Sequence, residues 1–319
     1  MQSALAASPT KPLTMPETTA PSIHWLHHAG QHLGLVPDLA GGVAAWQLER
    51  PEGALNLWRP WDGRNLDRYS LASFPMVPWS NRISDGGFTQ DGVFHPVALN
   101  RVGEPYPIHG DGWLQTWTLE QPADDTVEMT LSSQQFAGNP YAYHALQRFV
   151  LREDGMDQTL SVTHAGKQPL PYGLGQHPWF LRTPQTRLHA NVQGVWLSGA
   201  DPMPVAHSST FPPSWDPRAG LDVNGTLVDN AYTGWSGSAR IEWPENRVQL
   251  EMRVPAVADS GRNDGFCLLY RPPQGSAFCF EPVTQPIDAF HVEGRPGLQV
   301  LQTGQTLTLH VEWRFASLE

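Results

Sequence analysis

Apolar and polar residues alternate strictly in several windows of the chain, a period that places every second side chain on one face of a β-strand. The clearest windows contain Val127/Met129/Leu131, Val248/Leu250/Met252/Val254 and Leu307/Leu309/Val311/Trp313/Phe315. Each predicts a strand with one face against a core. Because no window of helical period carries a good cap, we expect an all-β chain.

Short turn clusters separate the predicted strands at spacings typical of antiparallel hairpins. They are Asp124-Asp125, Glu153-Asp154-Gly155, Gly166-Lys167-Gln168-Pro169 and Pro244-Glu245-Asn246. The Pro-rich segment 202–217 is expected to be a long surface loop.

Strand-like windows recur from about Val43 to Phe315 with no linker and no apparent internal repeat. This continuity predicts a single domain over residues 22–319, folded as one large antiparallel β-sandwich. Residues 1–21 are rich in Ala, Ser, Thr and Pro and lack the features of a signal peptide, so we expect a disordered tail there.

The composition of the chain excludes some classes of binding partner. The formal net charge of −11 and the lack of clustered Lys and Arg argue against nucleic acid and anionic membrane surfaces, and they suit a neutral small molecule. No stretch has the ~20 apolar residues of a membrane helix. Cys267 and Cys279 stand in apolar contexts, which predicts buried reduced thiols in a cytoplasmic protein. The composition carries no signal of oligomeric state.

Thirteen tryptophans are more than a core of this size requires. A flat ring beside a polar rim is a common way to hold the apolar face of a sugar. For each single tryptophan, a place in the core is nevertheless the more frequent outcome.

Four segments combine residue types that ordinary strands and turns do not need. The segment from Phe74 to Ile83 ends in Asn81-Arg82, and the arginine is either an ion-pair partner or a fork of donors for ligand hydroxyl groups. The segment from Tyr106 to Trp113 places His109 at a tight glycine turn, where it either binds a sugar oxygen or is simply exposed.

The segment Tyr172 to Phe180 contains Gly173 and Gly175, which permit close backbone approach, and His177 followed by a proline that restricts it. This histidine is either a proton donor or a satisfied core residue. The segment Phe278 to Pro286 places Glu281 on an apolar stretch, where burial would raise its pKa and make it a general base. The alternative is a Glu paired with an arginine for structural reasons.

These segments contain no phosphate-binding glycine loop, no dinucleotide fingerprint and no HExxH or zinc-finger spacing. Phosphoryl transfer, hydride transfer and zinc hydrolysis therefore lose support. We expect no cofactor and no metal site.

Taken in order, the four segments resemble the motifs of the aldose 1-epimerase (galactose mutarotase-like) family: N-R-I, an H-G-x-x-W-like segment, G-x-H-P-[WYF]-F and a late E-P-x-T. The resemblance covers nearly the whole chain after the tail and implies a large antiparallel β-sandwich. One departure is Asp111-Gly112-Trp113, where many members carry an aromatic residue after the glycine.

The resemblance implies that Glu281 is the general base and His177 the general acid. It further implies that Arg82, His109 and Asn81 bind the sugar. The family also carries an aspartate that grips sugar hydroxyl groups, and the segment from Val228 to Trp235 resembles that region. Asp229 is the candidate, with Asp222 nearby as the alternative.

The reaction implied is exchange of the α and β anomers of a free aldohexose. Glu281 would take the proton of the C1 hydroxyl while a protonated His177 gives its proton to the ring oxygen. Three alternatives stay open: a non-catalytic carbohydrate-binding protein, a glycoside hydrolase with Asp229 as second carboxylate, and an epimerase of hexose 6-phosphates. Arg182, just after the third motif, keeps the last one open.

Overall fold

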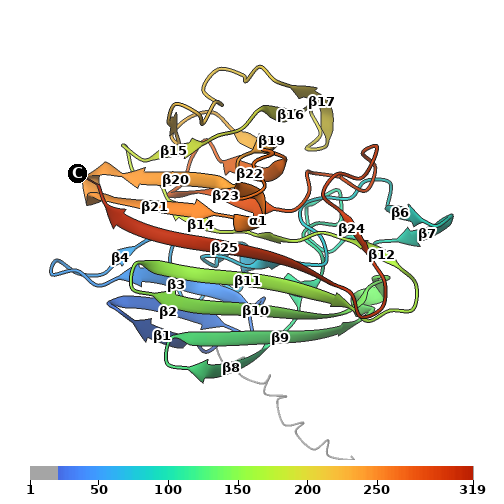
Figure 1. Cartoon of the computed structure of the whole chain (residues 1–319), viewed down its shortest axis with the longest axis horizontal. Helices are drawn as coiled ribbons and strands as arrows, with labels where there is room; N and C mark the ends of the chain where they lie inside the picture. The colour runs from blue at the N-terminus through green and yellow to red at the C-terminus, as the bar shows by residue number, and fades with distance from the viewer. Residues whose placement is uncertain (1–20, 319) are drawn as a thin grey trace, which may run out of the picture.

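Two large antiparallel sheets form the body of the protein (Figure 1). The computed structural model describes residues 21–318. The nine-stranded sheet has the order β18 (Leu221–Asp222), β15 (Arg187–Ala190), β20 (Ser238–Trp243), β21 (Val248–Arg253), β25 (Thr306–Ser317), β11 (Gly155–His164), β10 (Ala142–Arg152), β9 (Thr126–Gln134) and β8 (Thr118–Ala123). The eight-stranded sheet has the order β17 (Pro204–Ser208), β16 (Gly194–Ser198), β19 (Val228–Trp235), β22 (Gly265–Arg271), β23 (Ala277–Val283), β13 (Gly175–Gln176) and β5 (Pro75–Met76), and β14 (Trp179–Leu181) also pairs with β23.

Smaller sheets and single turns complete the described part of the chain. The strands are β1 (His24–His28), β2 (Gln31–Val36), β3 (Gly42–Leu48) and β4 (Leu55–Asn56) in one sheet, β6 (Gly87–Gln90) with β7 (Val93–Pro96), and β12 (Leu170–Tyr172) with β24 (Gln299–Leu301). The helical pieces are α1 (Pro255–Ala258) and the 3₁₀ turns η1 (Arg68–Ser70), η2 (Gly112–Leu114), η3 (Phe136–Gly138) and η4 (Pro244–Asn246). Within residues 21–318, none of these helices is long and apolar enough to cross a membrane.

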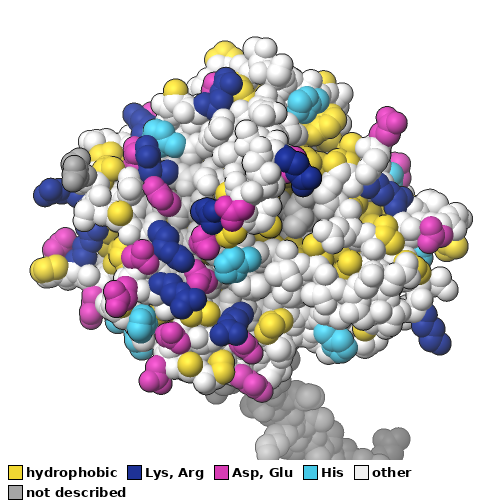
Figure 2. All heavy atoms as spheres, in the orientation of Figure 1, with side chains coloured by type: hydrophobic (Ala, Val, Ile, Leu, Met, Phe, Trp, Pro, Cys, Tyr) yellow, Lys and Arg dark blue, Asp and Glu magenta, His cyan; other side chains and the backbone are white. Residues whose placement is uncertain are grey.

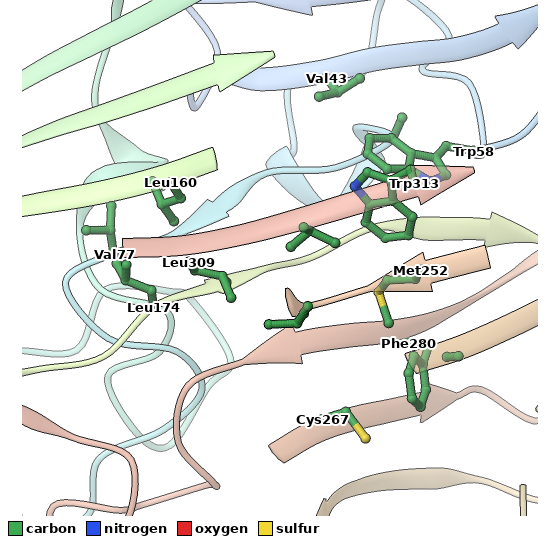
Figure 3. Close-up of a cluster of buried hydrophobic side chains, with 14 of the residues drawn as sticks. Val43, Trp58, Val77, Leu160, Leu174, Met252, Cys267, Phe280, Leu309 and Trp313 are labelled. Atoms are coloured by element: carbon green, nitrogen blue, oxygen red, sulfur yellow. The ribbon is translucent and has the colours of Figure 1, made fainter. Parts of the chain in front are cut away.

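The main core lies between the two large sheets. Figure 3 shows side chains of the nine-stranded sheet, such as Met252 and Trp313, and of the eight-stranded sheet, such as Phe280, within one buried cluster. The Trp58 ring meets Trp313 edge to face at 5.3 Å, one of the favoured arrangements of aromatic pairs. The three alternating windows of the sequence lie in β9, in β21 with Val254 just past its end, and in β25, and their apolar residues are buried apart from the half-buried Phe315.

The outer face of the nine-stranded sheet carries charges of both signs. Figure 2 shows acidic and basic side chains interspersed over this face. Several form cross-strand ion pairs, among them Arg148–Glu128 at 3.3 Å and Arg253–Glu312 at 3.1 Å. Exposed pairs of this kind contribute little free energy, about 0–1 kcal/mol each. Their effect is to distribute charges of both signs over this face, so that neither sign forms a patch.

The sequence pattern was wrong at two places. Strands begin at His24 rather than near Val43. The pattern did not reveal β2, because this strand is buried on both of its faces and therefore shows no alternation. The segment 202–217 is not all loop, since it contains β17, which pairs with β16. The tail predicted for residues 1–21 lies outside the described residues except for its last position.

Candidate active site

The register of β23 places His177 beside Glu281. Gly175 of β13 stands opposite Val283 and Trp179 of β14 stands opposite Cys279, so both short strands share one register along β23. His177 lies between them, and the same register puts it opposite Glu281, where cross-strand side chains are neighbours. The His177 Nε2 and Glu281 Oε1 atoms are 3.3 Å apart, and both side chains are 4% exposed.

The two glycines of this segment allow the chain to pass close to its neighbours. A Cβ atom at Gly173 would lie 2.2 Å from Gln285 Oε1, and one at Gly175 would lie 2.5 Å from the end of Met76. Both distances are shorter than van der Waals contact. The close approach predicted from the two glycines is therefore confirmed.

A second part of the site comes from two loops that hold each other. The backbone N–H of His109 donates to the Asn81 carbonyl oxygen at 2.9 Å, and the Asn81 N–H donates to His109 Nδ1 at 3.1 Å. Because Nδ1 accepts, a neutral His109 carries its proton on Nε2. Both residues have left-handed backbone, with φ of 55° for Asn81 and 60° for His109, a strained conformation that persists where the surroundings fix it.

Arg82 is held by two carboxylates. Its Nε donates to Glu104 Oε2 at 3.0 Å and its second terminal nitrogen to Glu104 Oε1 at 3.3 Å, while the first lies 3.5 Å from Asp229 Oδ2. Burial alone would lower the pKa of Arg82, but these two carboxylates outweigh burial and raise it. The arginine is thus a permanent cation with a fixed orientation.

A cavity of about 420 Å³ joins these parts, a size within the usual range for small-molecule sites. Its lining contains all six residues that the sequence predicts for the site: Asn81, Arg82, His109, His177, Asp229 and Glu281. Asp222, the alternative to Asp229, lies in β18 and forms an ion pair with Arg187 at 3.2 Å, outside this lining. The geometry therefore favours Asp229.

Burial controls the protonation of the His177–Glu281 pair. It raises the pKa of Glu281 well above its ordinary value, with a smaller contribution from the negative charge of Asp229, as the apolar segment predicts. Burial lowers the pKa of His177 to about 3. Both shifts favour the neutral forms, a protonated Glu281 and an uncharged His177. The protonated His177 expected from the sequence stays a prediction for the sugar-bound site.

Comparison with known proteins identifies the family. The family model described as aldose 1-epimerase matches residues 36–314. The chain belongs to the aldose 1-epimerase family. The resemblance inferred from the four motifs is confirmed, as is the predicted antiparallel β-sandwich.

Relatives of this family member span most of its length. The uncharacterised protein YphB of Escherichia coli (strain K12) is 31% identical over 252 residues, which cover 75% of this chain and 83% of YphB. A crystal structure from Escherichia coli K12, provisionally named an aldose 1-epimerase, superposes with a TM-score of 0.85 at 27% identity, over 93% of this chain and 99% of that one. A galactose mutarotase-like protein of Clostridium acetobutylicum has the same fold, with a TM-score of 0.78 at 15% identity, over 94% of this chain and 99% of that one.

Several residues that line the cavity of this aldose 1-epimerase family member were not predicted from its sequence. They are Tyr69, Arg101, Glu104, Ile108, Trp179, Leu227 and Tyr270. The ring of Trp179 lies 4.3 Å from the Arg59 guanidinium carbon, and the ring of Tyr69 lies 3.8 Å from that of Arg101. Among the residues that the structure describes, Trp179 is the one tryptophan in the lining, and most of the others are buried in the cores.

Asp111, where the chain departs from the family pattern, anchors the loop of His109 through hydrogen bonds of its side chain. Its carboxyl group is buried and accepts hydrogen bonds from Tyr143, from Asn139 at 2.7 Å and from Gln115 at 3.2 Å. Asp111 is absent from the cavity lining. Its contacts place it as a structural residue of the loop.

Proposed function

We propose that this protein is a mutarotase that interconverts the α and β anomers of a free aldohexose. The observation that carries the proposal is the contact between His177 Nε2 and Glu281 Oε1, at 3.3 Å, on the wall of a cavity of about 420 Å³. Two proton-transfer groups this close can serve two neighbouring oxygens of one sugar ring. Arg82, His109, Asp229 and Asn81 are the proposed sugar-binding groups.

Ring opening moves one proton from one oxygen to another. Glu281 takes the proton of the C1 hydroxyl, whose oxygen becomes the aldehyde oxygen. The electron pair of the bond between C1 and the ring oxygen passes to the ring oxygen, which takes a proton from His177. Rotation about C1–C2 exposes the other face of the aldehyde, and the same steps in reverse close the ring. Each such group typically contributes ~10²–10⁴-fold to the rate.

The pair must hold one proton in total, and its position must change when the sugar binds. Before a sugar binds, Glu281 holds it, because burial disfavours its charged form. Sugar hydroxyl groups that donate to the carboxylate stabilise its anion and lower its pKa. The proton then passes to His177, whose Nε2 lies 3.3 Å from Glu281 Oε1, and His177 becomes the acid. Binding of the sugar thus produces the protonated His177 and the ionised Glu281 that ring opening requires.

The charges of the cavity favour an uncharged sugar over a hexose phosphate. Among the described residues the lining contains two arginines, and both are paired: Arg82 with Glu104 and Asp229, and Arg101 with Asp67 at 3.1 Å. Arg182, which kept the phosphate alternative open, lies outside the lining and donates to the carbonyl oxygens of Pro272 and Ala277. A phosphate group would therefore face carboxylates without a free cation. The two free, buried thiols lead us to propose the cytoplasm as the compartment.

Polarimetry of freshly dissolved α-glucose and α-galactose tests the proposal. The protein should accelerate the change in rotation, and Glu281→Gln and His177→Asn should each remove most of that acceleration. Matched controls are Glu242→Gln and His189→Asn, which break the pair between His189 and Glu242 at 3.1 Å, remote from the cavity. Near-normal rates in Glu281→Gln and His177→Asn, with folding verified by circular dichroism, would refute the assignment.

A further inference from the structure

Cys279 lies beside the two proton-transfer residues, and the proposed reaction does not use it. Among residues 21–318, His177, Cys279 and Glu281 form a group whose potential ligand atoms all lie within 4.8 Å of one another. The thiol is free and fully buried. These three side chains offer a nitrogen, a sulfur and an oxygen, the ligand types that zinc binds in proteins.

The strand pattern explains why the three groups converge. Cys279 and Glu281 are two residues apart on β23, so their side chains leave the same face of the sheet. Cys279 stands between Tyr270 of β22 and Trp179 of β14, its partners on either side. Those two rings meet edge to face at 5.7 Å. They line the cavity while Cys279 does not, so the thiol lies behind them.

Distances within the group suit a tetrahedral cation. Zinc binds nitrogen and oxygen at about 2.0–2.2 Å and sulfur at about 2.3 Å, which puts neighbouring ligand atoms roughly 3.3–3.8 Å apart. His177 Nε2 and Glu281 Oε1 are already 3.3 Å apart. The Cys279 sulfur lies within 4.8 Å of both atoms, so it must move closer to them to join the same shell.

An independent observation also points to a missing ligand. Glu281 is 3% exposed, and its Oε2 atom is buried without a hydrogen-bond partner among the described residues. A buried polar oxygen without a partner costs free energy that a bound cation would recover. One thiolate and one carboxylate neutralise a divalent cation, so the occupied group would carry no net buried charge. The cavity supplies space for water in the fourth position.

We propose that His177, Cys279 and Glu281 form an inhibitory site for a thiophilic divalent cation of the zinc type. Coordination displaces the protons of the thiol and the carboxyl group into solvent, and the cation is not a cofactor. A bound cation occupies the lone pairs that the proton transfers require, so ring opening stops. Binding of the cation is independent of the proposed function, whereas inhibition rests on it.

Cobalt(II) is the probe for binding, because a thiolate bound to cobalt gives a sulfur-to-metal charge-transfer absorption in the near ultraviolet. Titration of the full-length protein should show this absorption with one cobalt per chain, and zinc should displace it. Cys279→Ala should abolish the absorption, and Cys267→Ala should keep it. Cys267 is the matched control because it is equally buried and free, and it lies in the main core (Figure 3).

Inhibition is measured by polarimetry in the same samples, relative to the metal-free rate of each variant. Zinc should inhibit the wild type and Cys267→Ala alike. Cys279→Ala should need at least about tenfold more zinc, because even residues that only orient metal ligands are worth 10–100-fold in affinity. Absence of the cobalt absorption in the wild type, or its survival in Cys279→Ala, would overturn the site. Full activity of the cobalt- or zinc-loaded wild type would overturn inhibition, and a metal-free wild type without mutarotation would count against the proposed function alone.

Discussion

Glu104 grips the guanidinium group of Arg82 at two points, 3.0 Å and 3.3 Å, on the wall of the cavity. This paired geometry fixes the plane of the guanidinium group and leaves its remaining nitrogen toward Asp229. The orientation of Arg82 toward a sugar thus depends on a residue that contributes no proton to the proposed reaction.

Replacement of Glu104 tests this dependence. Glu104→Gln should raise KM for the sugar by about tenfold, because hydrogen bonds to charged groups contribute ~1.5–3 kcal/mol and only part of that is lost. Because the His177–Glu281 pair is untouched, kcat should fall much less. Initial rates over a range of sugar concentrations give the two constants. Glu128→Gln, which breaks the surface pair with Arg148, is the control, and an equal loss in kcat would show that Glu104 acts on the chemistry instead.

The pH dependence of mutarotation follows from the single proton of the His177–Glu281 pair. Adding a second proton requires protonation of His177, whose pKa burial lowers to about 3. Removing the only proton requires ionisation of Glu281, whose pKa burial raises well above its ordinary value.

We therefore expect kcat/KM to be flat across mildly acidic pH. It should fall as the pH drops through about 3, and again as the pH rises through the raised pKa of Glu281. Buffer-corrected polarimetric rates across the pH range measure this profile. A fall centred near pH 6.5, the ordinary value for histidine, would contradict a neutral His177 in the free protein.

Asp111 should make stability depend on pH. Burial raises the pKa of its carboxyl group to about 7, although Tyr143, Asn139 and Gln115 oppose the shift by donating to it. Unfolded, the group titrates near 3.9. Between about pH 4 and pH 7 the folded protein holds a proton that the unfolded chain has released, so the stability from this group is complete below pH 4 and is lost as the pH rises to 7. The shift corresponds to on the order of 4 kcal/mol.

Asp111→Asn should remove this contribution to the pH dependence. The Oδ1 atom of Asn139 is buried without a partner among the described residues, so a turn of the Asn139 amide lets it accept from the amide introduced at position 111. Urea unfolding at pH 4.5 and pH 8 gives the free energy of unfolding of both proteins. The difference between wild type and variant should change by on the order of 3 kcal/mol between the two pH values, because pH 4.5 already lies above the unfolded pKa. A constant difference would show that Asp111 is ionised throughout.

The parts of the site that could be predicted are those whose chemistry conflicts with their local setting. Glu281 is conspicuous because its neighbours on β23 are apolar, and His177 because a proline follows it. Glu104 gives no such signal, since a glutamate in a polar loop is ordinary until the fold brings it to Arg82. Its role depends on a contact between residues 22 positions apart, which no local pattern records.

The protonation state of His177 was the other property of the site that the sequence could not predict. The motif suggests a histidine acid, but the charge of His177 depends on how completely the surrounding rings exclude water. Phe74 stacks on its imidazole with 4.5 Å between the centroids, and Tyr69 meets it edge to face at 5.5 Å. Those rings come from a segment about a hundred residues earlier in the chain. Burial of this kind is a property of tertiary structure alone.

The register that β13 and β14 share along β23 determines where the chain can tolerate insertions and deletions. An insertion of one residue within β23 would turn the Glu281 carboxylate from the cavity into the hydrophobic interior, since successive side chains of a strand point to opposite faces. Loops that rim the cavity, such as the one bearing Leu227, can lengthen or shorten without moving the reacting pair. Under the proposed function, preference for one sugar over another can therefore drift between related proteins while the reacting pair stays fixed.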